Sequence, residues 1–496
     1  MQAGIEREIL LERVQNQTRL AVIENRRLCE IQYERGERAK LAGNIYAGRV
    51  QNVLAGMNAA FVDIGLRKNA FLYAGDICYD VREEQALKDQ LEQRRIEQML
   101  RPGQMIVVQV AKEPGGSKGP RVSGSITLPG RLSVLLPTVR YAGVSKKIED
   151  PDERERLNGI ARRLSERCGA GVIVRTAGEG ATEEQIAADY AHLLSMWAQI
   201  EAQARHSAKP RLIQQDGSLT LRAIRDMLDE NVRAIRTDDA QIFQELKGFA
   251  RALAPEYEDR IELYAGEVPL FDLMRVDHQL EQAMERHVWL KSGGTLVIDE
   301  TEAMTVIDVN TAKFTGKKSL EETIFRLNCE AAEEIARQLR LRDLGGIVLI
   351  DFIDMEQECT REALLEHLRE ALKADRNRTN VLGMTALGLV EMTRKKVRQP
   401  LSKQLMRDCS SCLGSGREWT HESMAYRAVR EIWRRRRTGD TTAYVICTSE
   451  KVAGWIRTIG LPEGGRTVVY PCGSDASYEI LPCGGAQPVA GSEEEV

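Results

Sequence analysis

The chain has 496 residues, 43% of them hydrophobic, so it is long enough to form several domains with their own cores. Its 70 basic and 74 acidic residues give a net charge of −4, which excludes a uniformly basic coat and requires any nucleic-acid contact to come from local patches. No run of about 18 apolar residues occurs and the amino terminus is charged, so we expect no transmembrane segment, no signal peptide and a cytoplasmic protein.

The first 39 residues alternate apolar and polar side chains, which predicts a hairpin in a half-buried sheet. Residues 44–125 contain short strand-like runs broken by glycines, with a charged insert at 82–101. This pattern is typical of a small all-β barrel.

The barrel segment resembles the OB-fold RNA-binding module of RNA-handling enzymes. The resemblance implies that Phe61 and Phe71, ten residues apart, are stacking platforms for bases, and that Lys112 and Lys118 contact the RNA backbone. By residue type alone, phenylalanines in strands belong more often to the core.

Residues 126–214 carry two basic signals, Lys146 with Lys147, and the strand-end sequence GVIVRTAGEGA with Arg175 and Thr176. An arginine, a threonine and glycines after a strand predict an anion pocket, because the guanidinium fork suits a terminal phosphate and threonine adds a hydroxyl and an N–H. A solvated strand end is the alternative for any single arginine.

Residues 304–355 predict a strand, a long helix and a strand. The runs 305–309 and 347–350 are short and β-branched, whereas apolar residues between them recur every three to four positions. Ser319 with Glu322 predicts a capping box, and Gly345 with Gly346 predicts the end of the helix.

Two acids stand at equivalent places in these strands, Asp308 near the end of the first run and Asp351 directly after the second. Parallel neighbouring strands would bring the two carboxylates together, and such a pair suits Mg²⁺. Spacing alone leaves open the alternative that an aspartate simply begins a loop.

Three further signals lie near the carboxyl end. Arg394, Lys395, Lys396 and Arg398 form a basic cluster able to reach RNA phosphates, or only a solvated face. Of the ten cysteines only Cys409 and Cys412 form a close pair, half of a four-ligand Zn²⁺ site rather than a disulfide framework. Residues 434–437 are four arginines that could contact RNA or a partner subunit. The acidic, glycine-rich end of the chain is expected to be disordered.

Two stretches, IDVNTAKFTG and NCEAAEEIARQLRLRDLGGIVLIDFIDM, resemble the catalytic core of the ribonuclease E/G family. The resemblance implies that Asp308 and Asp351 hold a catalytic Mg²⁺, that Asn310 orients the scissile phosphate or the attacking water, and that Asp354 is structural. VRTAG is similar to the family's 5′-sensor, which implies that Arg175 and its neighbour Thr176 grip a 5′-monophosphate.

The same resemblance implies that Lys146 and Lys147 replace a basic pair, often arginines, beside the sensor; lysines keep the charge but lose the fork. It also implies that Cys409 and Cys412 are a zinc-link, in which two chains each donate two thiolates to one Zn²⁺. We therefore expect a homo-oligomer, either a dimer or a tetramer, and no long extension that recruits partner enzymes.

The fold class implied is α/β multidomain. The expected parts are an RNase H-like scaffold (1–39 and 215–282), an inserted OB-fold barrel (40–125), a 5′-sensor region (126–214), a DNase I-like catalytic domain (283–405), the zinc-link (406–416) and a small C-terminal domain (417–496).

The function implied is a Mg²⁺-dependent endoribonuclease that cleaves single-stranded RNA in rRNA and mRNA processing and decay and prefers 5′-monophosphorylated ends. One alternative is an RNA-binding assembly factor without cleavage, which would not need the carboxylate pair. Another is a DNA nuclease, against which stand the OB-fold pattern and the lack of a DNA-reading motif.

Overall fold

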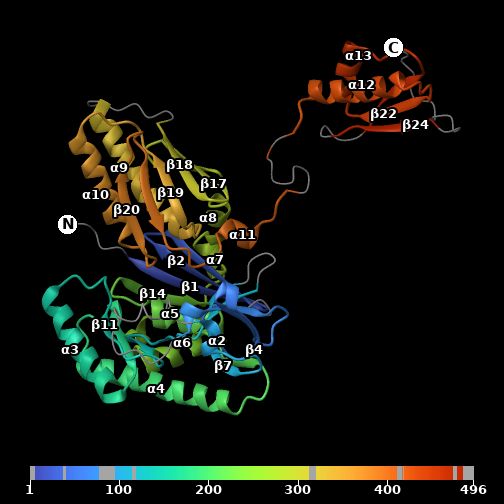
Figure 1. Cartoon of the computed structure of the whole chain (residues 1–496). Coiled ribbons are helices and arrows are strands. Elements are labelled where there is room, and N and C mark those ends of the chain that lie inside the picture. Colours follow the sequence, from blue (N-terminus) through green and yellow to red (C-terminus); the bar gives the residue numbers. More distant parts are fainter. Residues whose placement is uncertain are drawn as a thin grey trace. The chain divides into compact units, whose positions relative to one another are not determined.

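The computed structural model describes residues 6–36, 41–77, 95–113, 119–311, 320–409, 416, 418–472 and 477–483. The chain forms two compact units, Met1–Gln404 and Leu405–Val496 (Figure 1). Both units combine helices and sheets, as the predicted mixed α/β class requires.

A five-stranded sheet, in the order β15-β14-β1-β2-β3, forms the centre of the larger unit. The strands β1, β2 and β3 are antiparallel, whereas β14 and β15 continue from β1 in parallel. Helices α5 and α6 cover one face and pack on Ile9, Leu20 and Val22. The elements are β1 Arg7–Val14, β2 Gln17–Glu24, β3 Arg27–Arg35, β14 Val232–Thr237, β15 Ile261–Leu263, α5 Leu219–Met227 and α6 Ala240–Leu253.

The predicted hairpin of the first 39 residues is part of this sheet, which takes three strands from that segment instead of two. Asn25 and Arg26 both have positive φ (50° and 66°), as a tight two-residue turn between β2 and β3 requires. Neither residue is a glycine, so this second turn gives little signal in the sequence.

Five strands form a closed barrel, because β4 pairs with β5 on one side and with β7 on the other. This closed, OB-like barrel is the one expected from the sequence. Gly48 allows it to close tightly, since a Cβ there would lie 2.6 Å from Cγ1 of Val62. The elements are β4 Ile45–Leu54, β5 Ala59–Asp63, β6 Ala70–Tyr73, β7 Met105–Lys112, β8 Arg121–Ser123, the short α2 Ile96–Met99, and β13 Arg211–Gln214, which pairs with β4.

A four-stranded sheet, in the order β11-β12-β10-β9, shares one hydrophobic core with two long helices. Thr182 and Gln185 form a capping box at the start of α4. The elements are β9 Leu128–Pro129, β10 Ser133–Leu136, β11 Ala142–Val144, β12 Gly171–Val174, α3 Pro151–Cys168 and α4 Glu183–Arg205.

A six-stranded mixed sheet, in the order β16-β17-β18-β19-β21-β20, carries the two acids. Helices α9 and α10 pack on one of its faces. The elements are β16 His287–Trp289, β17 Thr295–Glu300, β18 Met304–Asn310, β19 Gly346–Asp351, β20 Thr379–Met384, β21 Val390–Arg394, α9 Leu320–Leu341 and α10 Glu358–Leu372, with the short helices α7 Leu270–Leu273, α8 Val276–Gln282 and α11 Leu401–Leu405.

The predicted strand, helix and strand are therefore present, with one difference at the end of the helix. Helix α9 ends at Leu341, and the left-handed residue after it is Asp343 (φ 51°), so the glycines do not end the helix. Gly346 (φ 103°) instead begins β19. The predicted cap at Ser319 lies outside the described residues.

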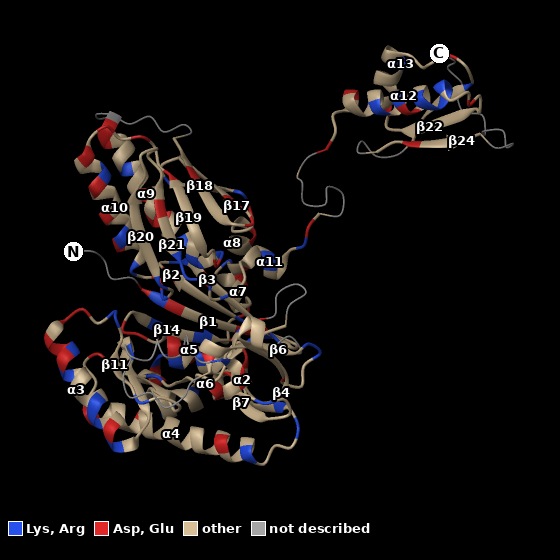
Figure 2. Cartoon of the chain, viewed as in Figure 1, with Lys and Arg blue, Asp and Glu red and all other residues tan. Residues whose placement is uncertain are grey.

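The smaller unit contains a three-stranded sheet, β23-β22-β24, and two helices that share its core. Figure 2 shows the basic end of α12, where Arg436 donates to the carbonyls of Asp440 (2.9 Å) and Thr442 (2.8 Å) and so stabilises the following turn. The elements are α12 His421–Arg437, β22 Tyr444–Thr448, α13 Glu450–Ile459, β23 Thr467–Pro471 and β24 Glu479–Pro482. In the described part of the chain, no helix is long and apolar enough to cross a membrane.

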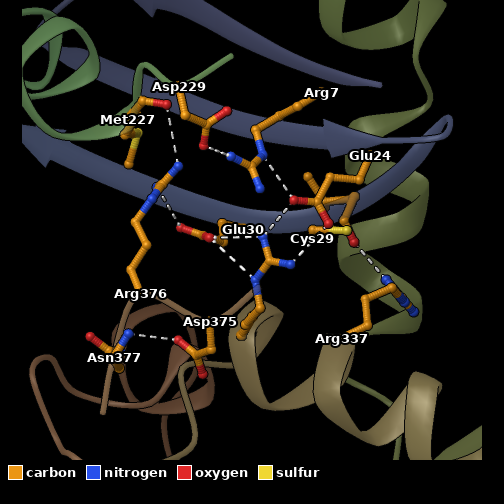
Figure 3. A network of polar contacts seen from close by, with 12 residues as sticks. Arg7, Glu24, Cys29, Glu30, Met227, Asp229, Arg337, Asp375, Arg376 and Asn377 are labelled. Atoms are coloured by element: carbon orange, nitrogen blue, oxygen red, sulfur yellow. Dashed lines mark hydrogen bonds and ion pairs between the residues drawn. The ribbon is translucent and has the colours of Figure 1, made fainter. Parts of the chain in front are cut away.

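A buried ion network joins α9 of the mixed sheet to β2 and β3 (Figure 3). Arg340 donates to both oxygens of Glu24 (2.9 Å each) and to Glu30 (3.0 Å), and its side chain is 5% exposed. Arg7 donates to Glu24 from the other side (2.9 Å). Burial alone would raise the pKa of Glu24, but Arg340 and Arg7 outweigh burial and lower that pKa to about 2.

We expect Arg340→Met to destabilise the larger unit by about 3 kcal/mol at pH 7, because it leaves two buried carboxylates without their main partner. Since the pKa of Glu24 falls from 4.5 to about 2 on folding, its stabilisation is present above pH 4.5 and is lost as the pH falls towards 2. The measurement is the urea midpoint of wild type and variant at pH 7 and pH 3, where the difference should shrink.

Arg326→Met is the matched control, because Arg326 forms an ion pair with Glu322 on the same helix but is 63% exposed. Its effect should stay within about 0.5 kcal/mol. Equal effects of the two variants would contradict a special role for the buried network.

Candidate active site

The two acids are register partners on neighbouring parallel strands, with Asp308 of β18 opposite Asp351 of β19. Side chains alternate between the faces of a strand, and the buried neighbours Ile307, Val309 and Ile350 face the core under α9 and α10. The carboxylates therefore lie together on the opposite, exposed face of the sheet. β18 and β19 are paired in parallel, as the sequence analysis required for the two carboxylates to meet. The pairings on either side, β17 with β18 and β19 with β21, are antiparallel.

Asn310 lies on the same face as Asp308, two residues further along β18. Its Nδ2 donates to Oδ2 of Asp308 (2.8 Å), which fixes the direction of that carboxylate. Loss of solvation and the negative charges of Asp308 and Asp354 raise the pKa of Asp351. Asp354, expected to be structural, thus acts electrostatically on the pair.

The acid pair fits a hydrated Mg²⁺. Among the described residues, no lysine or arginine forms an ion pair with Asp308 or Asp351, and each carboxylate lies beside the negative charge of the other. Mg²⁺ uses one or two carboxylates and keeps several waters. Within the same described ranges, no three or more His, Cys, Asp or Glu side chains converge as a metal cage.

Arg175 lies directly after β12, and its guanidinium is already held on two sides. Nη1 donates to the carbonyl oxygen of Gly130, and Nη2 donates to Oδ1 of Asp226 (2.8 Å). The hydroxyl of Thr176 contacts that of Ser145 (2.9 Å). The side chains of Arg175 and Asp226 are each 27% exposed, so the guanidinium remains accessible to a ligand.

The two lysines predicted beside Arg175 are both exposed. Nζ of Lys147 nevertheless donates to the carbonyl oxygen of Asp375 (2.8 Å), in the segment between α10 and β20, and the partial desolvation of this ammonium lowers its pKa. Lys147 therefore ties the segment between β11 and α3 to the segment that precedes β20 of the acid-bearing sheet.

Asp226 was not predicted from the sequence. It lies on α5, 51 positions from Arg175, in an amphipathic helix whose pattern signals only packing. No local sequence motif predicts an ion pair between residues as far apart in the chain as Arg175 and Asp226.

The two predicted stacking residues of the barrel lie on adjoining strands, β5 and β6. Phe61 and Phe71 are register partners with an edge-to-face contact (centroids 6.0 Å apart, 74°), and both are partly exposed. Lys112 is exposed at the end of β7, whereas Lys118 lies outside the described residues.

The predicted basic cluster is wrong for one of its members, Arg394. Arg394 is 4% exposed and binds Asp375 (2.6 Å) and Asp343 (3.1 Å), so it stabilises the fold. Arg398 pairs with the second oxygen of Asp343 (2.8 Å). Lys395 and Lys396 remain exposed.

The predicted zinc ligands are only partly described. Cys409 is exposed, and Cys412 lies outside the described residues.

Comparison with known proteins identifies the family. Residues 127–397 match the Ribonuclease E/G family. The chain is 43% identical over 455 residues to ribonuclease G of Haemophilus influenzae, covering 90% of this chain and 91% of that protein. Ribonuclease G of Escherichia coli strain K12 is also 43% identical, over 450 residues and the same shares of the two chains. Ribonuclease E of H. influenzae is 37% identical over 415 residues, 83% of this chain and 44% of that protein.

The resemblance inferred from the motifs is thus confirmed over nearly the whole chain, with higher identity to these ribonuclease G sequences than to ribonuclease E. The chain belongs to the ribonuclease E/G family of endoribonucleases.

Proposed function

We propose that this chain is a Mg²⁺-dependent endoribonuclease that cleaves single-stranded RNA in rRNA and mRNA processing and decay, in the cytoplasm, and prefers 5′-monophosphorylated ends. The observation that carries this proposal is the in-register pair of exposed carboxylates at Asp308 and Asp351 on a chain of this family.

In the proposed mechanism, Asp308 and Asp351 hold the metal ion, which when bound stabilises charge on the scissile phosphate and lowers the pKa of a bound water. Asn310 donates one side-chain N–H to Asp308. Its second N–H could donate to a phosphate oxygen, or its carbonyl oxygen could accept from the attacking water. The hydrogen bond to Asp308 would also hold that carboxylate in one orientation for binding a metal ion.

The barrel would hold the RNA strand. Phe61 and Phe71 both leave part of their rings exposed, so one base can stack on each, and stacking accepts every base. Lys112, at the open end of β7, would contact the backbone, with Lys118 in the same role. This mode favours single strands, whose bases are unstacked.

The finer fold assignments are part of the proposal. An RNase H-like scaffold is supported by the strand order β3-β2-β1-β14-β15, with three antiparallel strands followed by two parallel ones. We also propose a DNase I-like catalytic domain around the mixed sheet, and a zinc-link through which small C-terminal domains join a homo-oligomer.

We expect Asp308→Asn and Asp351→Asn each to reduce cleavage on the order of 10³-fold or more, because the metal supplies several kcal/mol of transition-state stabilisation. RNA binding should change little, since the barrel is untouched. The measurement is kcat/KM on a 5′-monophosphorylated single-stranded RNA with Mg²⁺, together with Kd.

Asp354→Asn is the matched control, because it removes the same charge beside the pair without removing a proposed ligand. We expect a change of less than about tenfold. Near-normal cleavage by Asp308→Asn or Asp351→Asn would overturn the metal assignment. A wild type that binds RNA without cleaving it would leave only the RNA-binding assembly factor, and equal cleavage of DNA and RNA of one sequence would favour a general nuclease.

The second expected outcome concerns assembly. Purified protein should contain about half a zinc per chain, because Cys409 and Cys412 supply two of the four thiolates that a structural site needs. Chelation should split the oligomer, and Cys409→Ser should do the same under reducing conditions, as measured by elemental analysis and sedimentation.

Cys359→Ser is the control, because Cys359 is an exposed cysteine on α10, outside the link. Protein without zinc, or an oligomer unchanged in Cys409→Ser, would rule out the shared site.

The third expected outcome concerns the 5′ end. Arg175→Ala should slow cleavage of monophosphorylated RNA about tenfold or more, since each charge-assisted hydrogen bond contributes roughly 1.5–3 kcal/mol. Cleavage of 5′-hydroxyl RNA should barely change. Lys146→Ala should act in the same direction more weakly, because its exposed ammonium offers charge without a fork.

The control is Arg163→Ala, which removes an arginine from the neighbouring helix α3 where it pairs with exposed Glu183. A wild type that ignores the 5′ end, or an Arg175→Ala variant equally slow on both RNAs, would show that Arg175 is not a sensor.

A further inference from the structure

The smaller unit exposes a basic and aromatic face on α12 (Figure 2). The buried residues Met424, Ala425, Ala428 and Ile432 place one side of this helix against the core of its own unit. The opposite side carries exposed side chains of two kinds, which recur at helical spacing. This basic aromatic face consists of Tyr426, Arg427, Arg430, Trp433, Arg434 and Arg437.

The four arginines at 434–437 divide between the fold and this face. Arg435 pairs with Glu431, and Arg436 donates to carbonyl oxygens of the turn that follows the helix, so both stabilise the unit. The other two arginines of the run are exposed. Over all the ranges that the structure describes, none of the four arginines on the basic aromatic face forms an ion pair with a carboxylate, so their charges are available to a ligand.

Two aromatic rings on this side of the helix lie against guanidinium groups. Cζ of Arg427 is 4.5 Å from the ring centroid of Trp419, which precedes the helix, and Cζ of Arg437 is 4.9 Å from that of Trp433. Trp419 stays 58% exposed and Trp433 46% exposed, so the arginines cover only part of each ring. Exposed rings and guanidinium planes are both surfaces on which a base can stack.

We propose that the basic aromatic face of α12 is a second RNA-binding surface, which holds a single strand by stacking on its bases and pairing with its phosphates. The proposal goes beyond the cleavage function, because the face includes neither the acid pair, nor the barrel, nor the pocket at Arg175. A single strand offers unstacked bases together with phosphates, which match the interleaved rings and arginines. A duplex keeps its bases stacked inside and offers the arginines only its backbone and groove edges.

The charge and pattern of the face argue against two other occupants. An isologous contact between two copies of the face would place four arginines opposite four arginines, which repel one another. A membrane surface requires a continuous apolar stripe, but the apolar stripe of α12 lies in the core of the smaller unit. The exposed rings are separated by arginines. A polyanion that carries flat bases fits both the charges and the rings.

The test is the double variant Arg430→Gln with Arg434→Gln in the full chain, which removes two exposed arginines that do not lie over a ring. Affinity for a labelled single-stranded RNA would be measured by fluorescence anisotropy without added Mg²⁺, over a range of salt concentrations. We expect the affinity at low salt to fall on the order of tenfold. The slope of log K against log salt should become shallower by about 1.4, because each phosphate contact to a single strand contributes about 0.7.

Trp433→Ala tests the stacking. Because a base stacked on an aromatic ring contributes substantially to affinity, this variant should bind the single strand on the order of tenfold more weakly. Binding of a duplex RNA of the same sequence should stay within about twofold of wild type, since its bases cannot reach the ring. The mass of the assembly and the far-UV circular dichroism should match those of the wild type in both variants.

Two control variants make the same kinds of change away from the face. Arg435→Gln with Arg457→Gln removes two arginines of the same unit that pair with glutamates. Tyr470→Ala removes a 51% exposed ring from β23. Its neighbour Val469 packs on the core with the helices, so Tyr470 lies on the other side of the sheet. Both controls should leave the affinity and the salt slope close to those of the wild type.

The outcomes separate this surface from the proposed cleavage function. Unchanged affinity and salt slope in the arginine variant and in Trp433→Ala would overturn the surface, whether or not the wild type cleaves RNA. Loss in the arginine variant alone, equal for single strand and duplex, would overturn the single-strand mode. An altered assembly mass with unchanged RNA affinity would assign the face to a protein contact. A wild type that shows the expected losses but does not cleave would support the surface and overturn the catalytic assignment.

Discussion

The contact on which the larger unit depends is the pairing of Arg340 with Glu24 and Glu30. All three side chains are almost fully buried, so none is satisfied by water, and each needs the others to offset its loss of hydration. Arg340 lies in the last turn of α9, the helix that packs beneath the acid pair, and both glutamates belong to the central sheet. This contact therefore fixes the acid-bearing sheet relative to the centre of the unit.

The same junction reaches the proposed phosphate pocket. Arg376 lies 3.5 Å from Glu30 and donates to the carbonyl oxygen of Met227 (3.4 Å), the residue after Asp226. Asp375 accepts from Lys147 through its backbone and binds Arg394 of β21 through its side chain. Since β21 adjoins β19, residues 375 and 376 connect the pocket to the strand that carries Asp351. The proposed phosphate pocket is thus joined to the acid-bearing sheet through residues 375 and 376.

The sequence predicted those features that depend on local patterns. The strand, helix and strand around the acids follow from hydrophobic periodicity, and the barrel follows from short runs between glycines. The third strand of the first segment was missed, because a turn of Asn25 and Arg26 lacks the glycine that usually marks it. Asp226, Glu24 and Arg340 were missed for a different reason: their partners lie 51 to 316 positions away, and no local pattern encodes such pairs.

The wrong prediction for Arg394 shows why charge runs are poor guides to RNA contacts in this chain. With 70 basic and 74 acidic residues, most arginines can find an internal carboxylate, and Arg394 and Arg398 share Asp343. A basic side chain is available to RNA only where the fold leaves it exposed, as at Lys112 and Lys146, or only partly neutralised, as at Arg175. Arg175 is the intermediate case, because the carbonyl oxygen of Gly130 and the carboxylate of Asp226 both hold its guanidinium while its side chain stays 27% exposed.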